Sequence, residues 1–150
     1  MAWRVTSASR IRGFSLVELM IVLVIAGILA SLAWPAYTDH VRRSWRAEAQ
    51  TGLLELAQAL EKHRRRTMSY TGTWQGASLP APPKASVYAS GTVPLDGNGT
   101  TRYVLRIQQA NASGYEIRAI PVGDQARDAC GTLILDHTGF RQSTSGSNCW

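Results

Sequence analysis

The hydrophobic positions form one uncharged run near the start of the chain and then continue as a helical pattern. Residues 19–38 include no charged side chain. At 1.5 Å per residue this run makes a helix of about 30 Å, which matches the hydrocarbon core of a bilayer. The pattern therefore predicts one membrane-crossing segment.

Downstream, apolar or small residues recur every three or four positions and define one face of an amphipathic helix. This face comprises Val41, Trp45, Ala49, Gly52, Leu53, Leu56, Leu60 and His63. The opposite, polar face comprises Arg42, Arg43, Arg46, Glu48, Glu55, Glu61 and Lys62. Together with the apolar run, this predicts a single helix over residues 16–66. We expect Pro35 to kink it, because proline removes an amide donor, and Gly27 to be a second weak point.

The remainder of the chain has the pattern of a loop followed by strands. Residues 71–101 are rich in Gly, Pro, Ser and Thr, which predicts a long connection with little regular structure. "RYVLRIQQ" and "GYEIRAIPV" alternate apolar and polar positions, and two short runs flank "DHTG" as in a hairpin. We predict three or four antiparallel strands, covered on one face by the amphipathic half of the helix. The fold class is α+β.

Charge and cysteine content add two constraints. The net charge of +6 comes from a few arginines before the apolar run and from residues 39–66, so it is weak evidence for a nucleic-acid partner. Cys130 and Cys149 are the two cysteines. Behind a membrane-crossing segment they suggest one disulfide in an oxidising compartment, with two free buried thiols as the alternative. This orientation leaves the N-terminus in the cytoplasm.

The stretch "RGFSLVELMIVLVIAGILASLAWPAY" resembles the N-terminus of a type IV pilin precursor with a class III signal. The resemblance implies that a prepilin peptidase cleaves between Gly13 and Phe14 and that Phe14 is then N-methylated. It places Glu18 at the fifth mature position and Pro35 at the family's helix kink. The implied domains are a leader (1–13), a transmembrane and filament-core helix (14–38) and a periplasmic or extracellular globular domain (39–150).

Glu18 is the one acidic residue at the start of this apolar helix. An ionisable group in a membrane segment is by default a functional site with a partner. The resemblance supplies that partner, the amino group of Phe14 on a neighbouring subunit, so Glu18 is the predicted assembly residue. The alternative is that Glu18 reaches the nearby membrane interface.

The C-terminal stretch "DACGTLILDHTGFRQSTSGSNCW" resembles the end of PilE-like minor pilins. The resemblance implies a structural subunit without a cofactor, assembled with other pilins into a filament for adhesion, twitching motility or DNA uptake. It also implies a prepilin peptidase and methyltransferase and an inner-membrane assembly platform as partners. A type II secretion pseudopilin is the first alternative, and a membrane-anchored domain that never polymerises is the second.

The sequence contains none of the common nucleophile, zinc-protease or phosphate-loop signatures, which favours a protein that is not an enzyme. Three aspartates, Asp124, Asp128 and Asp136, lack the spacing of a calcium loop. The basic stretch "KHRRR" at residues 62–66 has two interpretations. In the first, Arg64, Arg65 and Arg66 contact DNA phosphates. In the second, they complement the helix dipole at a solvated helix end.

Overall fold

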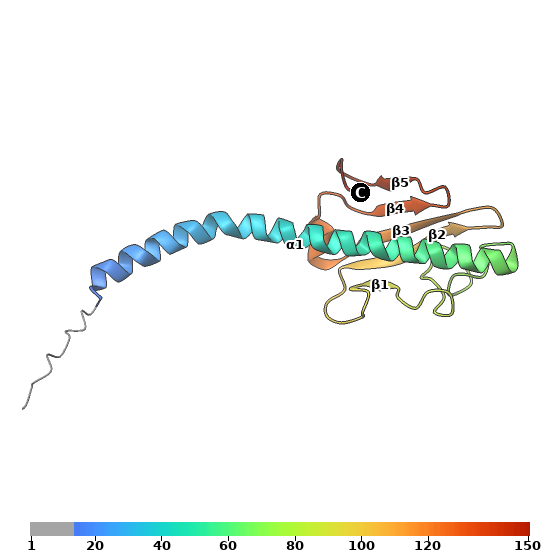
Figure 1. The fold of residues 1–150 in the computed structure, drawn as a ribbon, viewed down its shortest axis with the longest axis horizontal. Coiled ribbons are helices and arrows are strands. Elements are labelled where there is room, and N and C mark those ends of the chain that lie inside the picture. Colours follow the sequence, from blue (N-terminus) through green and yellow to red (C-terminus); the bar gives the residue numbers. More distant parts are fainter. Residues whose placement is uncertain (1–13) are drawn as a thin grey trace, which may run out of the picture. The chain divides into compact units, whose positions relative to one another are not determined.

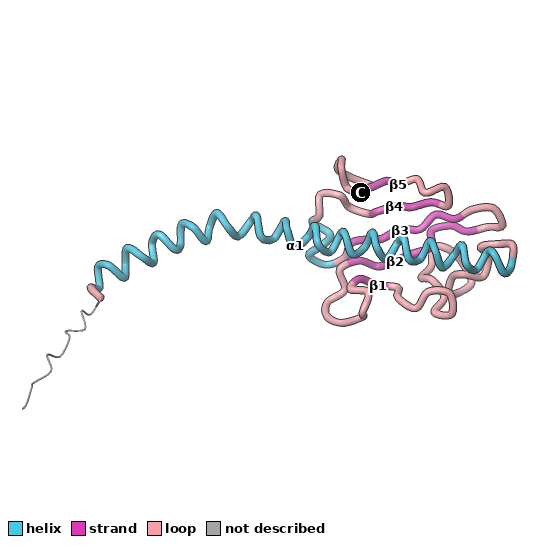
Figure 2. The backbone as a smooth tube through the Cα atoms, in the orientation of Figure 1, coloured by secondary structure: helices cyan, strands magenta, loops and turns pink. Residues whose placement is uncertain are grey.

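The computed structural model describes residues 14–150, and its fold is drawn in Figures 1 and 2. The chain divides into two compact units, Met1–Asp39 and His40–Trp150. Gly13 and the predicted leader, residues 1–13, lie outside the described residues.

The described part of the first unit is the beginning of helix α1, which spans Leu16–Thr67. The predicted single helix over residues 16–66 is thus confirmed, and Pro35 lies inside it. The large apolar side chains of this half are exposed, for example Val17 at 62% and Trp34 at 73%. α1 is long and apolar enough to cross a membrane. A helix that is apolar on all sides requires an apolar environment, which this unit alone does not supply.

The second unit joins the rest of α1 to an antiparallel sheet of five strands in the order β1-β2-β3-β4-β5. The strands are β1 (Thr92–Val93), β2 (Tyr103–Ala110), β3 (Tyr115–Pro121), β4 (Leu133–Asp136) and β5 (Arg141–Ser143), with a 3₁₀ helix η1 at Gly123–Arg127. The hairpin around "DHTG" is confirmed as β4 and β5. One strand more than predicted is present, because β1 has only two residues and shows no alternation.

The core of this unit lies between α1 and one face of the sheet, which α1 crosses in Figure 1. Leu53, Leu56 and Leu60 of α1 are fully buried, as the helical spacing predicts. Strands β2 and β3 contribute every second residue to the core, for example Leu105 and Ile117. Because strand side chains alternate between faces, the polar residues of β2 and β3 lie on the opposite face of the sheet.

The segment at residues 71–101 is largely irregular, as predicted, but it is fixed to the remainder of the unit. Ala81 exchanges two backbone hydrogen bonds with Ile107 of β2, at 3.0 and 2.8 Å. The Glu48 carboxylate of α1 accepts the Leu95 amide at 2.9 Å, and Glu55 accepts the Tyr88 hydroxyl at 2.9 Å. Two acidic residues of the predicted polar face therefore hold the loop against the helix.

Candidate functional site

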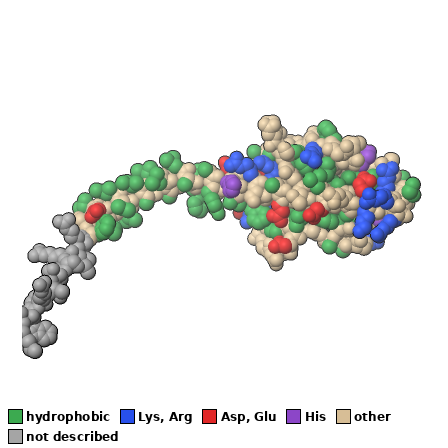
Figure 3. All heavy atoms as spheres, in the orientation of Figure 1, with side chains coloured by type: hydrophobic (Ala, Val, Ile, Leu, Met, Phe, Trp, Pro, Cys, Tyr) green, Lys and Arg blue, Asp and Glu red, His purple; other side chains and the backbone are tan. Residues whose placement is uncertain are grey.

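The C-terminal end of α1 carries a cluster of basic side chains. Lys62, Arg64, Arg65 and Arg66 are all exposed, and the three arginines form the last turn of the helix. Figure 3 shows Lys and Arg side chains gathered at this end of the unit. We call these four residues the cationic helix end. Basic residues here complement the negative end of the helix dipole, whichever partner they contact.

Arg64 differs from the others because its side chain is held in place. Its Nη1 donates to the Tyr70 hydroxyl at 3.0 Å, and its guanidinium lies 5.0 Å from the centre of the Tyr70 ring. The Tyr70 hydroxyl in turn donates to Glu61 at 2.7 Å. Burial, followed by the hydrogen bond to Glu61, raises the pKa of Tyr70, so this hydroxyl stays protonated at neutral pH.

Arg65 and Arg66 make no side-chain hydrogen bond or ion pair within residues 14–150. Their guanidinium groups therefore face solvent and are available to an external anion. A guanidinium is permanently charged and can donate two parallel hydrogen bonds to one phosphate. The described part of the chain thus presents two uncommitted guanidinium groups beside a third, anchored one.

The turn that follows α1 is attached to the sheet at the loop between β2 and β3. The Tyr70 amide donates to the Asn111 carbonyl at 3.1 Å, and the Tyr70 ring packs edge-on against Tyr115 with centroids 4.9 Å apart. His63 Nε2 donates to the Thr71 carbonyl at 3.1 Å. These contacts join the cationic helix end to the loop between β2 and β3. The backbone that carries the basic side chains is therefore held in place.

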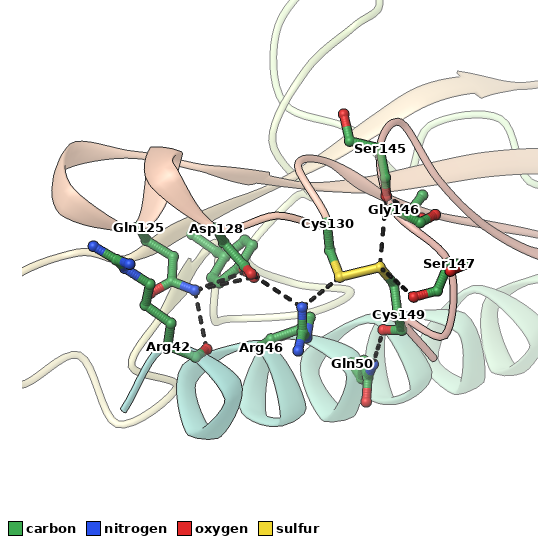
Figure 4. Close-up of polar contacts among 12 residues, drawn as sticks. Arg42, Arg46, Gln50, Gln125, Asp128, Cys130, Ser145, Gly146, Ser147 and Cys149 are labelled. Atoms are coloured by element: carbon green, nitrogen blue, oxygen red, sulfur yellow. Dashed lines mark hydrogen bonds and ion pairs between the residues drawn. A yellow bond between two sulfur atoms is a disulfide. The ribbon is translucent and has the colours of Figure 1, made fainter. Parts of the chain in front are cut away.

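A second polar cluster joins η1 to the part of α1 that lies at the start of the second unit (Figure 4). Arg46 forms an ion pair with Asp128 at 3.0 Å, and their side chains are 14% and 5% exposed. The other Asp128 oxygen accepts the Tyr103 hydroxyl at 3.0 Å, while Gln125 donates to the Arg42 carbonyl at 3.0 Å. Helical spacing predicts Arg46 on the polar face of α1; in the folded unit its side chain is largely buried against Asp128 and the disulfide.

The two cysteines form the predicted disulfide, with Cα atoms 5.7 Å apart. Both are buried, and the bridge lies against α1. Gln50 donates to the Cys149 carbonyl at 2.6 Å, and Arg46 contacts the Cys130 sulfur (Figure 4). The bridge thus holds the C-terminal loop onto the same helix that carries the cationic end. Among the described residues, no three His, Cys, Asp or Glu side chains are grouped as metal ligands.

Removing the disulfide is expected to destabilise the protein without changing its fold. The bridge joins residues 19 positions apart. Replacing both cysteines with alanine should lower the free energy of unfolding by about 3 kcal/mol, because the unfolded chain regains the entropy of the open loop. Urea unfolding followed by circular dichroism measures this loss. Wild-type protein unfolded under reducing conditions is the control and should show a similar loss; an unchanged midpoint would contradict the prediction.

The residues predicted to act in processing and assembly lie at the other end of α1. Glu18 is exposed in the first turn of the helix, and Phe14 precedes the helix with 73% of its surface exposed. Gly27 and Pro35 both lie within the continuous helix. The pairing of Glu18 with a neighbouring subunit and the kink remain predictions.

Comparisons with known proteins agree with this arrangement. The profile of a family described as "Type IV minor pilin ComP, DNA uptake sequence receptor" matches residues 35–134. A second profile, the prokaryotic N-terminal methylation motif, matches residues 8–34. An apolar helix that begins with this motif and packs its second half on an antiparallel sheet defines a type IV pilin. The chain belongs to the ComP family of type IV minor pilins.

Similar curated proteins match over a short part of the chain. Fimbrial protein EcpC of Eikenella corrodens is 60% identical over 38 residues, which cover 25% of each chain. The fimbrial protein of Moraxella nonliquefaciens is 55% identical over 40 residues, covering 27% of this chain and 26% of that protein. The matches thus span about a quarter of these relatives.

Two solved structures are similar over most of their own length. The minor pilin PilV of Neisseria meningitidis has a TM-score of 0.52 at 16% identity, covering 74% of this chain and 95% of that one, and it shows the fold. A type IV pilin from Shewanella oneidensis is 28% identical, with a TM-score of 0.47, covering 73% and 97%. Pilins of this family are structural subunits of filaments.

Proposed function

We propose that this chain is a minor pilin that presents a DNA-binding surface on a type IV pilus. The observation that carries the proposal is the cationic helix end: Arg65 and Arg66 are exposed and have no side-chain partner in the described chain, beside an anchored Arg64 and on a backbone attached to the sheet. The family description supports it, since it names a receptor for DNA uptake sequences. DNA is a natural partner for such groups, because phosphate contacts supply most of the nonspecific affinity of DNA-binding proteins.

The proposal includes the route by which the chain reaches the pilus. The apolar half of α1 first anchors the chain in the inner membrane, with residues 39–150 on the periplasmic side. A peptidase removes residues 1–13, Phe14 is methylated, and the assembly platform transfers the subunit into the filament. There the new amino group of one subunit meets Glu18 of its neighbour, and residues 39–150 face outward. The methylation-motif match supports the processing steps. The same filament serves adhesion or twitching motility.

The proposal is tested by DNA binding of the full chain in nonionic detergent. Fluorescence anisotropy with a labelled duplex should show binding that weakens steeply as salt increases. In an Arg65→Gln/Arg66→Gln variant the plot of log K against log salt should become shallower by about 2, because each lost phosphate contact removes about 0.9 from the slope. The affinity at low salt should fall by more than tenfold.

A matched control removes the same charge from the other end of the unit. Arg43 and Arg127 are exposed, and Arg43 lies about 35 Å along α1 from Arg66. An Arg43→Gln/Arg127→Gln variant should bind nearly as wild type. Equal losses in both variants would show that net charge alone attracts DNA. No binding of the wild type at low salt would overturn the proposal.

A further inference from the structure

The residue that follows the cationic helix end has an unusual conformation. Met68 has a backbone φ of +60°, and its side chain is 81% exposed. This left-handed conformation, at the end of a helix, is normally occupied by glycine or asparagine. A bulky side chain there is an outlier, and an exposed methionine gains nothing from burial. The intramolecular contacts of the folded unit therefore do not explain this residue.

The backbone on both sides of Met68 is fixed by hydrogen bonds. Its amide donates to the Arg64 carbonyl at 2.7 Å, which ends α1. Thr67 Oγ1 donates to the Ser69 carbonyl at 2.9 Å, and the next residue, Tyr70, is buried and bonded to the β2–β3 loop. A strained residue persists only where its surroundings determine it, and such residues concentrate at functional sites. The fold holds the Met68 side chain out into solvent.

The chemical surroundings of Met68 combine exposed cations with a protruding apolar side chain. Three arginines lie within the four positions before it, and Glu61, the nearest acid along the chain, is engaged by Tyr70. Proteins that kink DNA combine such cations on the phosphates with one protruding apolar side chain, including methionine, that enters a base step from the minor groove. Methionine is unbranched and flexible, which suits it to fill an opened step.

We propose that Met68 inserts between two base pairs of DNA held at the cationic helix end, while Arg65 and Arg66 contact the flanking phosphates. This inference rests on the proposed function. It adds a distinct property, because phosphate contacts alone leave the bases stacked. It also supplies a source of selectivity, since pyrimidine–purine steps unstack at lower cost than other steps and are favoured by a wedge.

The test uses a duplex that contains 2-aminopurine, whose fluorescence rises when its neighbours unstack. Saturating wild-type protein, as the full chain in nonionic detergent, should raise the signal severalfold. A Met68→Asn variant removes the wedge but keeps a residue that tolerates the left-handed conformation. At saturation it should give no rise, while its binding should keep the wild-type salt dependence, which the phosphate contacts set. A Met68→Leu variant, which keeps an apolar side chain, should retain the rise.

The outcomes separate this inference from the proposed function. DNA binding without a fluorescence rise, or an equal rise with Met68→Asn, overturns the wedge and leaves the phosphate contacts standing. Absence of any DNA binding overturns both.

Discussion

Replacing Asp128 with alanine is expected to lower the free energy of unfolding by about 3 to 5 kcal/mol, the cost of breaking a buried ion pair from one side. Asp128 is the carboxylate that neutralises Arg46 at 3.0 Å, and it also accepts the Tyr103 hydroxyl at 3.0 Å. Burial raises the pKa of Tyr103 far above its ordinary value, so this hydroxyl remains a donor. Without Asp128, the Arg46 guanidinium and the Tyr103 hydroxyl would both lose their acceptor at a site that is shielded from water. Urea unfolding of the full chain in detergent, followed through the tryptophans, gives the measurement.

Two variants show whether the loss of stability comes from the unpaired charge of Arg46. Asp124 is 82% exposed and lies 3.9 Å from Arg102, so Asp124→Ala should change stability by less than about 1 kcal/mol, as surface pairs do. A double variant, Arg46→Met/Asp128→Leu, replaces the pair with apolar side chains and should recover most of the lost stability. If the double variant is as unstable as Asp128→Ala, the stranded charge is not the cause.

Replacing Glu18 with alanine is expected to abolish incorporation into filaments while the protein still inserts into the membrane. Glu18 is the one carboxylate at the start of an otherwise apolar helix half. When apolar helices pack in a filament, a buried amino group without a counter-ion is strongly disfavoured. The alanine variant would leave the amino group of the neighbouring subunit unpaired, and it removes no apolar surface that membrane insertion requires.

Fractionation followed by immunoblotting measures this effect. The variant should be present in membranes at the wild-type level and absent from sheared surface filaments. Asp124→Ala, which removes an acid from the exposed surface of the globular unit, is the control and should enter filaments normally. Normal incorporation of Glu18→Ala would contradict the pairing. It would favour an interfacial role for this carboxylate instead.

Features that depend on nearby residues could be predicted from the sequence. The bounds of α1 followed from an apolar run that continues into a three-and-four spacing, and Leu53, Leu56 and Leu60 are buried as that spacing requires. The β4–β5 hairpin followed from two short runs on either side of "DHTG". The N-terminal motif was recognisable for the same reason, since its residues are contiguous. The disulfide needed only the number of cysteines and the expected compartment.

Contacts between distant residues became visible only in the folded chain. Arg46 and Asp128 are 82 positions apart, and helical spacing alone placed Arg46 on the polar face of α1 without showing what covers it. Periodicity shows on which side of a helix or strand a residue lies. It does not show which distant segments of the chain pack over that side in the folded protein. The same holds for Tyr70, whose bond to Asn111 fixes the turn after α1. The sequence shows the basic residues of the cationic helix end, whereas their anchoring and the exposed, left-handed Met68 result from tertiary packing.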